Sequence, residues 1–288
     1  MSDRGDSIAI ARQYMDSLLV ESRIMGSGMP STRFELLGEN FETPIMTAAL
    51  SHLDLVGMAE GARQAGAAVC IGMGDNDELC RVLETGAKVI KVIKPYADPE
   101  EIYRRMQCAR EHGAMAVGMD FEHAINVNDA EDSVVAGLPM RAMPLEEIRD
   151  IVQMAGLPFF AKGILSARDA RICREIGCAG VILSHHNGLM RYAVPPVMVL
   201  PEIRKAVGPD MKIIVDGGIE TGFDAYKALA LGADAVSVGR VLMDPLKNQG
   251  AEGVRDTIRA MTGQLQAMMR RTAVEDLAHM DPTVIHRM

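Results

Sequence analysis

The chain has 288 residues, and 48% of them are hydrophobic, which is enough to bury the core of one sizeable domain. Asp and Glu outnumber Lys and Arg, and the formal net charge of −9 argues against nucleic acid or an anionic membrane as a partner. The N-terminus is polar, and no apolar run approaches the roughly 18 residues that a membrane helix needs. We therefore expect a soluble protein with neither a signal peptide nor a membrane span.

The cysteines are five, an odd number, and they form no C-x-x-C pair: Cys70, Cys80, Cys108, Cys173 and Cys178. Most of them lie inside apolar patterns, where a thiol behaves as a small buried hydrophobe. This usage favours a cytoplasmic protein with free thiols over one with disulfides or a zinc site.

Residues 1–43 precede the repetitive part of the chain. The apolar spacing over 8–24 predicts an amphipathic helix. Residues 33–41 are expected to form a short hairpin or plug, which covers the apolar N-terminal end of the domain that follows.

From residue 44 onward, short β-branched runs alternate with longer helical patterns, which is typical of βα units around a parallel sheet. Eight strands are predicted, over 44–48, 68–72, 88–93, 115–120, 158–162, 180–184, 212–216 and 235–239. The clearest helices between them are expected over 98–113, 144–156, 166–177 and 222–232. Several of these helices open with a capping residue or Pro and close with Gly.

The chain ends with a predicted helix over 250–271 and a tail to residue 288 that is a short helix or loop. The connection 121–143 is long for a compact domain, so we consider it a candidate lid. The whole pattern predicts one α/β domain, a (β/α)8 TIM barrel. Its N-terminal extension covers 1–43, its core 44–250, and its C-terminal helix and tail 251–288.

Polar or glycine residues stand at the ends of successive predicted strands, where a parallel barrel builds its active site. Asp216, Gly217 and Gly218 end the seventh strand, and Gly239 and Arg240 end the eighth. Glycines there let backbone N–H groups approach a ligand, and the arginine adds a charged fork. This corner of the barrel predicts a phosphate-binding site.

Lys162, His186 and Asp120 end three other strands and form the candidate catalytic group. Lys162 follows an apolar run, so its buried cation requires an anionic partner or the loss of its proton. It could stabilise negative charge on a cofactor or form a Schiff base. His186 is suited to proton transfer near neutral pH, and Asp120 can fix the tautomer of its ring.

A metal site is the alternative use of the same strand ends. Oxygen and nitrogen ligands are available at Asp120, Glu122, His123, His185 and His186. Their spacing is not diagnostic of any metal ion, and we predict none.

Three stretches together carry a specific family resemblance. They are Pro-Phe-Phe-Ala-Lys-Gly at 158–163, Gly-Val-Ile-Leu-Ser-His-His at 180–186, and Asp-Gly-Gly at 216–218 continuing through Lys-Ala-Leu-Ala-Leu-Gly-Ala at 227–233 to Gly-Arg at 239–240. With these motifs, the chain from about residue 33 to 277 resembles the FMN-dependent α-hydroxy acid dehydrogenase and oxidase family. That family includes glycolate and lactate oxidases, and type 2 isopentenyl diphosphate isomerases are its distant relatives. The chain looks like a divergent, short bacterial member.

The resemblance implies an FMN-dependent oxidoreductase that acts on a 2-hydroxy acid or a related small anionic substrate. Lys162 would then lie against the flavin, His186 would take a proton from the substrate, and Asp120 would partner the histidine. The cofactor-binding residues implied in this way are Ala48, Ala49, Lys162, Ser184, Asp216, Gly217, Gly218, Gly239 and Arg240.

The chain departs from the family pattern at the anion contacts. Leu189 replaces the arginine that grips the substrate carboxylate, and Glu220 replaces the arginine that follows the Asp-Gly-Gly motif. A carboxylate at residue 220 is a like charge beside a phosphate. We expect Lys94, Arg141 or Arg191 to supply the missing substrate contacts, for a different or larger substrate.

Two other functions stay open on the same barrel. One is a non-redox isomerase or lyase, with or without flavin, in which His186 and Asp120 move protons or Lys162 forms a Schiff base. The other is a binding protein for a phosphorylated ligand that has lost the chemistry. The resemblance also implies a homo-oligomer, a tetramer or an octamer.

Overall fold

The computed structural model describes residues 5–288, so the first four residues of the predicted extension lie outside it. Eight parallel strands form one sheet in the spatial order β4-β13-β12-β11-β10-β7-β6-β5. They are β4 (Ile45–Thr47), β5 (Val69–Ile71), β6 (Val89–Ile93), β7 (Ala116–Asp120), β10 (Phe159–Lys162), β11 (Gly180–Leu183), β12 (Lys212–Asp216) and β13 (Ala235–Val238). Each begins and ends within one residue of its predicted position.

The sheet closes into a barrel between β4 and β5. The backbone N–H of Thr47 donates to the carbonyl of Ala68 at 3.4 Å. The hydroxyl of Thr47 donates to the carbonyl of Cys70 and accepts from its N–H, each at 2.9 Å. A side chain thus completes the strand pairing, and the predicted TIM barrel is confirmed.

The barrel interior is a packed apolar core below the polar strand ends. Phe160 fills its centre, and its neighbours leave room for it: a Cβ at Gly118 would lie 2.6 Å from the Phe160 carbonyl, and one at Gly180 would lie 2.3 Å from its ring. The predicted plug is confirmed as the hairpin of β2 (Phe34–Leu36) and β3 (Glu39–Phe41). Its Leu36 and Phe41 are buried against the interior side chains of the barrel.

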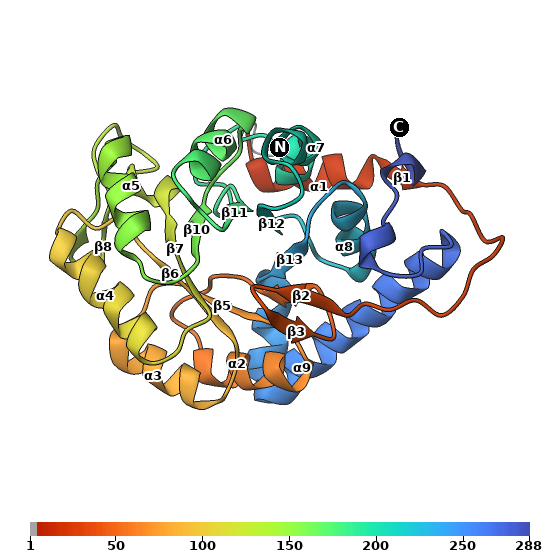
Figure 1. Ribbon diagram of the computed structural model, residues 1–288, viewed down its shortest axis with the longest axis horizontal. Helices are drawn as coiled ribbons and strands as arrows, with labels where there is room; N and C mark the ends of the chain where they lie inside the picture. Colours follow the sequence, from red (N-terminus) through yellow and green to blue (C-terminus); the bar gives the residue numbers. More distant parts are fainter. Residues whose placement is uncertain (1–4) are drawn as a thin grey trace.

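Helices surround the ring of strands (Figure 1). They are α2 (Leu55–Gln64), α3 (Asn76–Glu84), α4 (Pro99–Glu111), α5 (Leu145–Met154), α6 (Ala167–Glu175), α7 (Pro196–Val207), α8 (Gly222–Ala230) and α9 (Arg240–Arg271). The expected caps are present: the side chains of Asp98 and Ser166 accept backbone N–H groups at the starts of α4 and α6, and Thr221 forms a capping box with Asp224 at the start of α8.

The N-terminal helix is shorter than predicted. Helix α1 (Ser7–Asp16) ends before the Leu-Leu-Val segment of β1 (Leu18–Val20). This segment pairs antiparallel with β14 (Ile285–Arg287) at the end of the chain. The prediction of one helix to residue 24 was wrong because a distant strand partner, invisible in the local pattern, competes with the helix.

The C-terminal helix is longer than predicted. α9 starts at Arg240, directly after β13, and a kink at Gly250, with φ 59°, separates its first part from the predicted helix. The tail forms η2 (Leu277–His279), η3 (Pro282–Val284) and β14, so its last residues are a strand and not the helix or loop predicted.

The long connection 121–143 begins with η1 (Phe121–Ala124) and contains a small hairpin of β8 (Val134–Val135) and β9 (Leu138–Pro139). A bridge between Tyr96 and Met140 joins its far end to the segment after β6. Within residues 5–288, no helix has the length and apolar character needed to cross a membrane.

Candidate active site

A ring of polar side chains lies at the carboxyl ends of the strands, and all of them except the partly exposed Asp216 are buried. Each ring residue stands two positions after an interior apolar or glycine residue, so the alternation of the strand directs it into the barrel mouth. The ring therefore follows directly from strand register. Its members are Lys94, Asp120, Lys162, Ser184, Asp216 and Ser237.

Asp120 is the hub of this ring. One carboxylate oxygen, Oδ2, lies 2.6 Å from His186 Nδ1, 2.9 Å from Lys94 Nζ and 3.2 Å from Lys162 Nζ. Burial opposes ionisation, but Lys162, His186 and Lys94 outweigh it and hold the pKa of Asp120 well below its ordinary value. Asp120 is therefore an anion shared by three nitrogen groups.

His186 is held in one orientation. Its Nδ1 donates to the anionic Asp120, so its other ring nitrogen, Nε2, is left as a proton acceptor. Its backbone N–H donates to the Ser184 hydroxyl at 3.0 Å, and its φ of 44° lies in the left-handed region, as does that of Asn187 at 56°. Burial lowers the pKa of His186 despite the opposing effect of Asp120, so the ring is a neutral base.

Lys162 remains a cation. It is 3% exposed, with Asp216 Oδ2 3.8 Å from its Nζ in addition to Asp120. Burial acts to lower its pKa, but Asp120 and Asp216 reverse this and raise the pKa of Lys162 above its ordinary value. A protonated amine is not a nucleophile, so the raised pKa disfavours a Schiff base at this lysine.

Asp216 is fixed by two hydroxyl groups. Ser184 donates to its Oδ2 and Ser237 donates to its Oδ1, both at 2.8 Å. Ser184 thus contacts the backbone of His186 on one side and Asp216 on the other. Because Asp216 directly precedes the two glycines, these bonds position the start of the glycine turn.

His123 belongs to this group, although its sequence position suggested only a metal ligand. Its Nδ1 accepts a hydrogen bond from Lys94 Nζ at 2.9 Å, and its ring packs edge-on against that of His186 with centroids 4.6 Å apart. Burial and the neighbouring Lys94 lower the pKa of His123 to about 4, so the ring is neutral with its proton on Nε2. His123 therefore offers an N–H donor beside the base.

Ligand atoms of Asp120, His123 and His186 lie within 4.8 Å of one another. However, the ammonium groups of Lys94 and Lys162 both contact Oδ2 of Asp120. Two cations at this position repel a divalent ion, so the site favours proton chemistry over metal binding.

Glu122 is a half-buried acid at the edge of the same group. Burial raises its pKa to about 7, and its Oε2 has no hydrogen-bond partner among the described residues. The folded state therefore holds this proton more tightly than the unfolded chain, in which the pKa is close to 4.5. The stability from Glu122 is fully present below pH 4.5 and is lost as the pH rises to about 7.

Glu122→Gln is therefore expected to stabilise the protein at pH 8, by up to about 3 kcal/mol, and to have little effect at pH 4.5. Urea unfolding at the two pH values measures the difference. Glu131→Gln, at an exposed position of the same connection, is the matched control and is expected to be neutral. An equal effect of Glu122→Gln at both pH values would contradict a carboxyl group at residue 122 that titrates between them.

A pocket opens beside His186 over the predicted phosphate corner. Gly217 and Gly218, with φ of 103° and 76°, make a turn that other residues adopt only under strain. Gly239 precedes α9, and none of the described side chains caps that helix, so its first N–H groups are available to an anion. Residues that line the pocket are Ala48, Ala49, Leu50, Lys162, His185, His186, Asn187, Asp216, Gly217, Gly218, Ile219, Glu220, Ser237, Gly239, Arg240, Val241 and Met243.

His185 is a second residue whose role the sequence did not indicate. Its Nδ1 accepts the N–H of Gly188 at 3.2 Å, which leaves the proton on Nε2. This Nε2 is buried, lines the pocket and has no hydrogen-bond partner among residues 5–288. A buried donor without a protein partner is available to an acceptor atom from outside the chain. The glycine turn, the uncapped helix and this donor fit the phosphate-bearing cofactor that the sequence predicts.

The carboxylate of Glu220 is flanked by two arginines. Arg240 Nη2 lies 3.5 Å from one oxygen of Glu220, and Arg12 Nη1 lies 4.0 Å from the other. Arg12 comes from α1, far from the glycine turn in sequence. The like charge expected to oppose a phosphate is therefore balanced locally.

Of the three residues predicted to contact the substrate, only Lys94 lies among the catalytic side chains. Lys94 lies inside the ring, bound to Asp120 and His123. Arg141 pairs with Glu147 through both guanidinium nitrogens, at 2.9 and 2.6 Å, and does not line the pocket. Arg191 is exposed on the loop after β11 and is not a pocket residue either.

The chain is similar in sequence to FMN-dependent dehydrogenases and to 2-hydroxy acid oxidases. A family model described as FMN-dependent dehydrogenase matches residues 122–287, more than half of the chain. An L-lactate oxidase of Lactobacillus jensenii is 28% identical over 88% of this chain and 71% of its own length. Glycolate oxidase 3 of Arabidopsis thaliana is 34% identical over 58% of this chain and 46% of its own length. The chain thus spans less than half of that relative.

The fold matches solved structures over nearly the whole chain. A mandelate oxidase variant with an FMN adduct superimposes with a TM-score of 0.87 and 24% identity, over 99% of this chain and 92% of the other. The family match confirms the resemblance read from the three sequence motifs, and with it FMN as the cofactor. The chain therefore belongs to the FMN-dependent dehydrogenase family.

Proposed function

We propose that the protein is an FMN-dependent oxidoreductase that converts a 2-hydroxy acid to the corresponding 2-oxo acid. The observation that carries this proposal is the pairing of His186 Nδ1 with the anionic Asp120 at 2.6 Å, which leaves Nε2 as a base at the mouth of the phosphate pocket. Relatives named lactate and glycolate oxidases support the choice of substrate class.

The cofactor would be held along the pocket. We assign its phosphate to the N–H groups of Gly217, Gly218, Gly239 and Arg240, and its other contacts to Ala48 and Ala49 at the end of the first strand. Lys162 supplies a fixed positive charge to the same pocket, where negative charge develops during the reaction. Ser184 and Asp216 support these contacts. Ser184 holds the loop that carries His186, and Asp216 holds the start of the turn formed by Gly217 and Gly218.

In the proposed reaction, Nε2 of His186 takes the proton of the substrate hydroxyl and a C=O bond forms at the α-carbon. FMN, when bound, accepts the hydride equivalent that leaves this carbon. Asp120 stabilises the imidazolium that forms on His186. Since Asp120 already carries a negative charge and is fully buried, it needs no rearrangement during the step.

We assign the substrate carboxylate to His123. The arginine that the family uses is Leu189 here, whereas His123 presents its Nε2–H beside His186 and receives support from Lys94. A neutral N–H donor backed by a lysine can bind a carboxylate, although more weakly than a bidentate arginine.

His123→Ala is accordingly expected to raise KM for the 2-hydroxy acid about 10-fold or more, with the FMN affinity unchanged. Steady-state kinetics and an FMN titration of the same preparation separate the two effects. His279→Ala, which removes an exposed histidine on η2, is the control. A KM equal to that of the wild type would remove His123 from the substrate site.

The function is tested by anaerobic mixing of the FMN-loaded protein with a panel of 2-hydroxy acids. The expected result is loss of the flavin absorbance and formation of one 2-oxo acid per flavin. Substrate turnover without any loss of flavin absorbance and without an electron acceptor would instead indicate an isomerase or lyase. A phosphorylated ligand recovered unchanged, with no substrate consumed, would indicate a binding protein.

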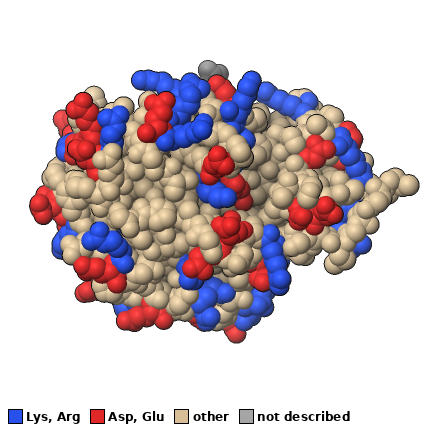
Figure 2. Space-filling view, viewed as in Figure 1, with Lys and Arg blue, Asp and Glu red and all other residues tan. Residues whose placement is uncertain are grey.

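We further propose that the chain acts in the cytoplasm on small molecules and forms a tetramer or octamer. All five cysteines are free, as a reducing compartment permits. Lys and Arg are mixed with Asp and Glu over the face in Figure 2. The extended segment before β2 exposes Ile24, Met25 and Met29 by 64%, 90% and 80%, which favours a subunit contact there. Light scattering tests this, and a monomer at micromolar concentration would refute the assembly.

A further inference from the structure

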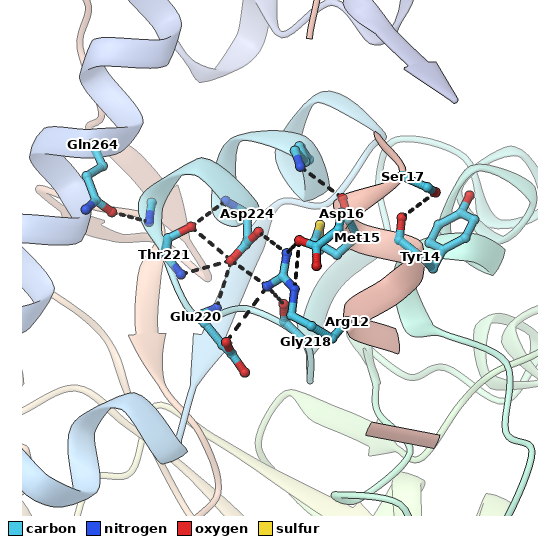
Figure 3. Close-up of polar contacts among 12 residues, drawn as sticks. Arg12, Tyr14, Met15, Asp16, Ser17, Gly218, Glu220, Thr221, Asp224 and Gln264 are labelled. Atoms are coloured by element: carbon cyan, nitrogen blue, oxygen red, sulfur yellow. Dashed lines mark hydrogen bonds and ion pairs between the residues drawn. The ribbon is translucent and has the colours of Figure 1, made fainter. Parts of the chain in front are cut away.

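Helix α1 contacts both loops that border the pocket. At its start, Ser7 donates to the carbonyl of Met190 at 2.6 Å and accepts from the N–H of Ala193 at 2.9 Å, on the loop that carries His186. Further along the helix, Arg12 contacts the Gly218 carbonyl in the glycine turn and Asp224 at the start of α8 (Figure 3). Helix α1 therefore contacts both the loop that carries His186 and the glycine turn that we assign to the phosphate.

Arg12 makes a two-pronged contact with Asp224. Its Nη1 and Nη2 lie 3.0 and 2.9 Å from the two carboxylate oxygens, and Asp224 is only 3% exposed. Asp224 in turn accepts the N–H groups of Glu220 and Thr221, at 3.1 and 3.0 Å. Arg12 thus anchors the carboxylate that shapes the backbone directly after the glycines.

Arg12 also fixes the peptide that leaves Gly218. Its Nη1 donates to the Gly218 carbonyl at 3.4 Å. Because the peptide group is planar and trans, the N–H of Ile219 points to the opposite side from this carbonyl. Ile219 lines the pocket, so the arginine stabilises a backbone donor in the wall that we assign to the phosphate.

The charges around Arg12 explain why this position matters. Asp224, Glu220 and Asp16 lie within 4.0 Å of its guanidinium. Without Arg12, Glu220 and the buried Asp224 would present negative charge behind the glycine turn, with Arg240 as the one cation that the described residues leave paired with Glu220. A phosphate placed on that turn would then meet net repulsion.

Resting on the proposed FMN function, we propose that Arg12 is a positioning residue for the cofactor phosphate. It neutralises Glu220 and Asp224 and holds the Gly218 peptide. Arg12 thus supplies, from α1, the positive charge that is missing from the Asp-Gly-Gly motif because residue 220 is a glutamate. The N-terminal extension is on this account part of the cofactor site and not only a cover of the barrel.

The test compares FMN with riboflavin, which has the same ring and no phosphate. Dissociation constants of both flavins are measured on the apoprotein by fluorescence quenching. Arg12→Gln is expected to raise the dissociation constant of FMN about tenfold and to change that of riboflavin by no more than about twofold. Only the phosphate of FMN lies close to the uncompensated carboxylates. Adding Glu220→Gln to Arg12→Gln should restore most of the FMN affinity.

Three further variants distinguish an effect of charge on FMN binding from a general loss of structure. Arg12→Lys keeps the charge and should keep most of the preference for FMN. Ser7→Ala loosens the other end of α1 without changing charge and should leave the ratio of the two dissociation constants unchanged. Glu220→Gln alone should increase the preference for FMN severalfold, which tests the charge balance even if Arg12→Gln does not fold.

Equal weakening of both flavins by Arg12→Gln, or no rescue by Glu220→Gln, would overturn the role of Arg12 while FMN binding by the wild type stands. If the wild type binds neither flavin, the proposed function itself fails, and the role of Arg12 fails with it.

Discussion

Replacement of His186 by Ala is expected to lower kcat by about three orders of magnitude, because a positioned general base contributes on the order of 10²–10⁴ to such a rate. The imidazole is the one group in the described site that combines a free acceptor nitrogen with a fixed anionic partner. FMN affinity should change little, since the assigned phosphate contacts are backbone groups on other strands. Stopped-flow reduction of the flavin by the best 2-hydroxy acid measures the effect.

His112→Ala provides the matched control, because this histidine is exposed at the end of α4. His186→Ala that still reduced its flavin at the wild-type rate would exclude His186 as the base. A parallel loss of flavin binding would assign His186 to the cofactor site and not to proton transfer.

Asp120→Asn is expected to cost about 3–5 kcal/mol of stability and to lower kcat at least as much as the loss of His186 does. The amide keeps the shape of the carboxylate but leaves Lys94 and Lys162 as buried cations without their shared anion. It also replaces the anionic acceptor that fixes the His186 tautomer with a neutral amide, which can donate as well as accept. Urea unfolding and flavin reduction measure the two effects on the same variant.

Lys94→Met in the Asp120→Asn background removes one of the two cations that share Asp120 and should recover part of the stability, with no recovery of kcat. Asp256→Asn on the surface of α9 is the control and should be neutral, because its pair with Arg255 is exposed to solvent. Wild-type stability of Asp120→Asn would contradict the charge network centred on this residue.

The barrel was predictable because its signals are local. A short β-branched run and a glycine or capping residue define each βα unit, and the register of eight such units determines which side chains reach the mouth. Lys162 and Asp120 could be placed at neighbouring strand ends for this reason. The sequence failed where distant segments pair, as in the segment 18–20, which is a strand because its partner lies at 285–287.

The site was predictable at its strand ends and not in its loops. His186 follows a recognisable strand motif, whereas His123 lies on a 3₁₀ turn whose direction no residue pattern determines. His185 could have been suspected from its place between a buried serine and the base. Arg12 gave no signal, because its contact with Asp224 joins residues 212 positions apart. Arg141 looked like a free cation because its pair with Glu147 depends on the fold of the connection.

The absorption spectrum of the purified protein, with identification and quantification of the flavin that heat denaturation releases, is the decisive measurement for FMN as the cofactor. We expect the two visible flavin bands and one FMN per chain, or uptake of one added FMN per chain by the apoprotein. A colourless protein that takes up no added FMN would leave the barrel without the cofactor on which its proposed chemistry depends.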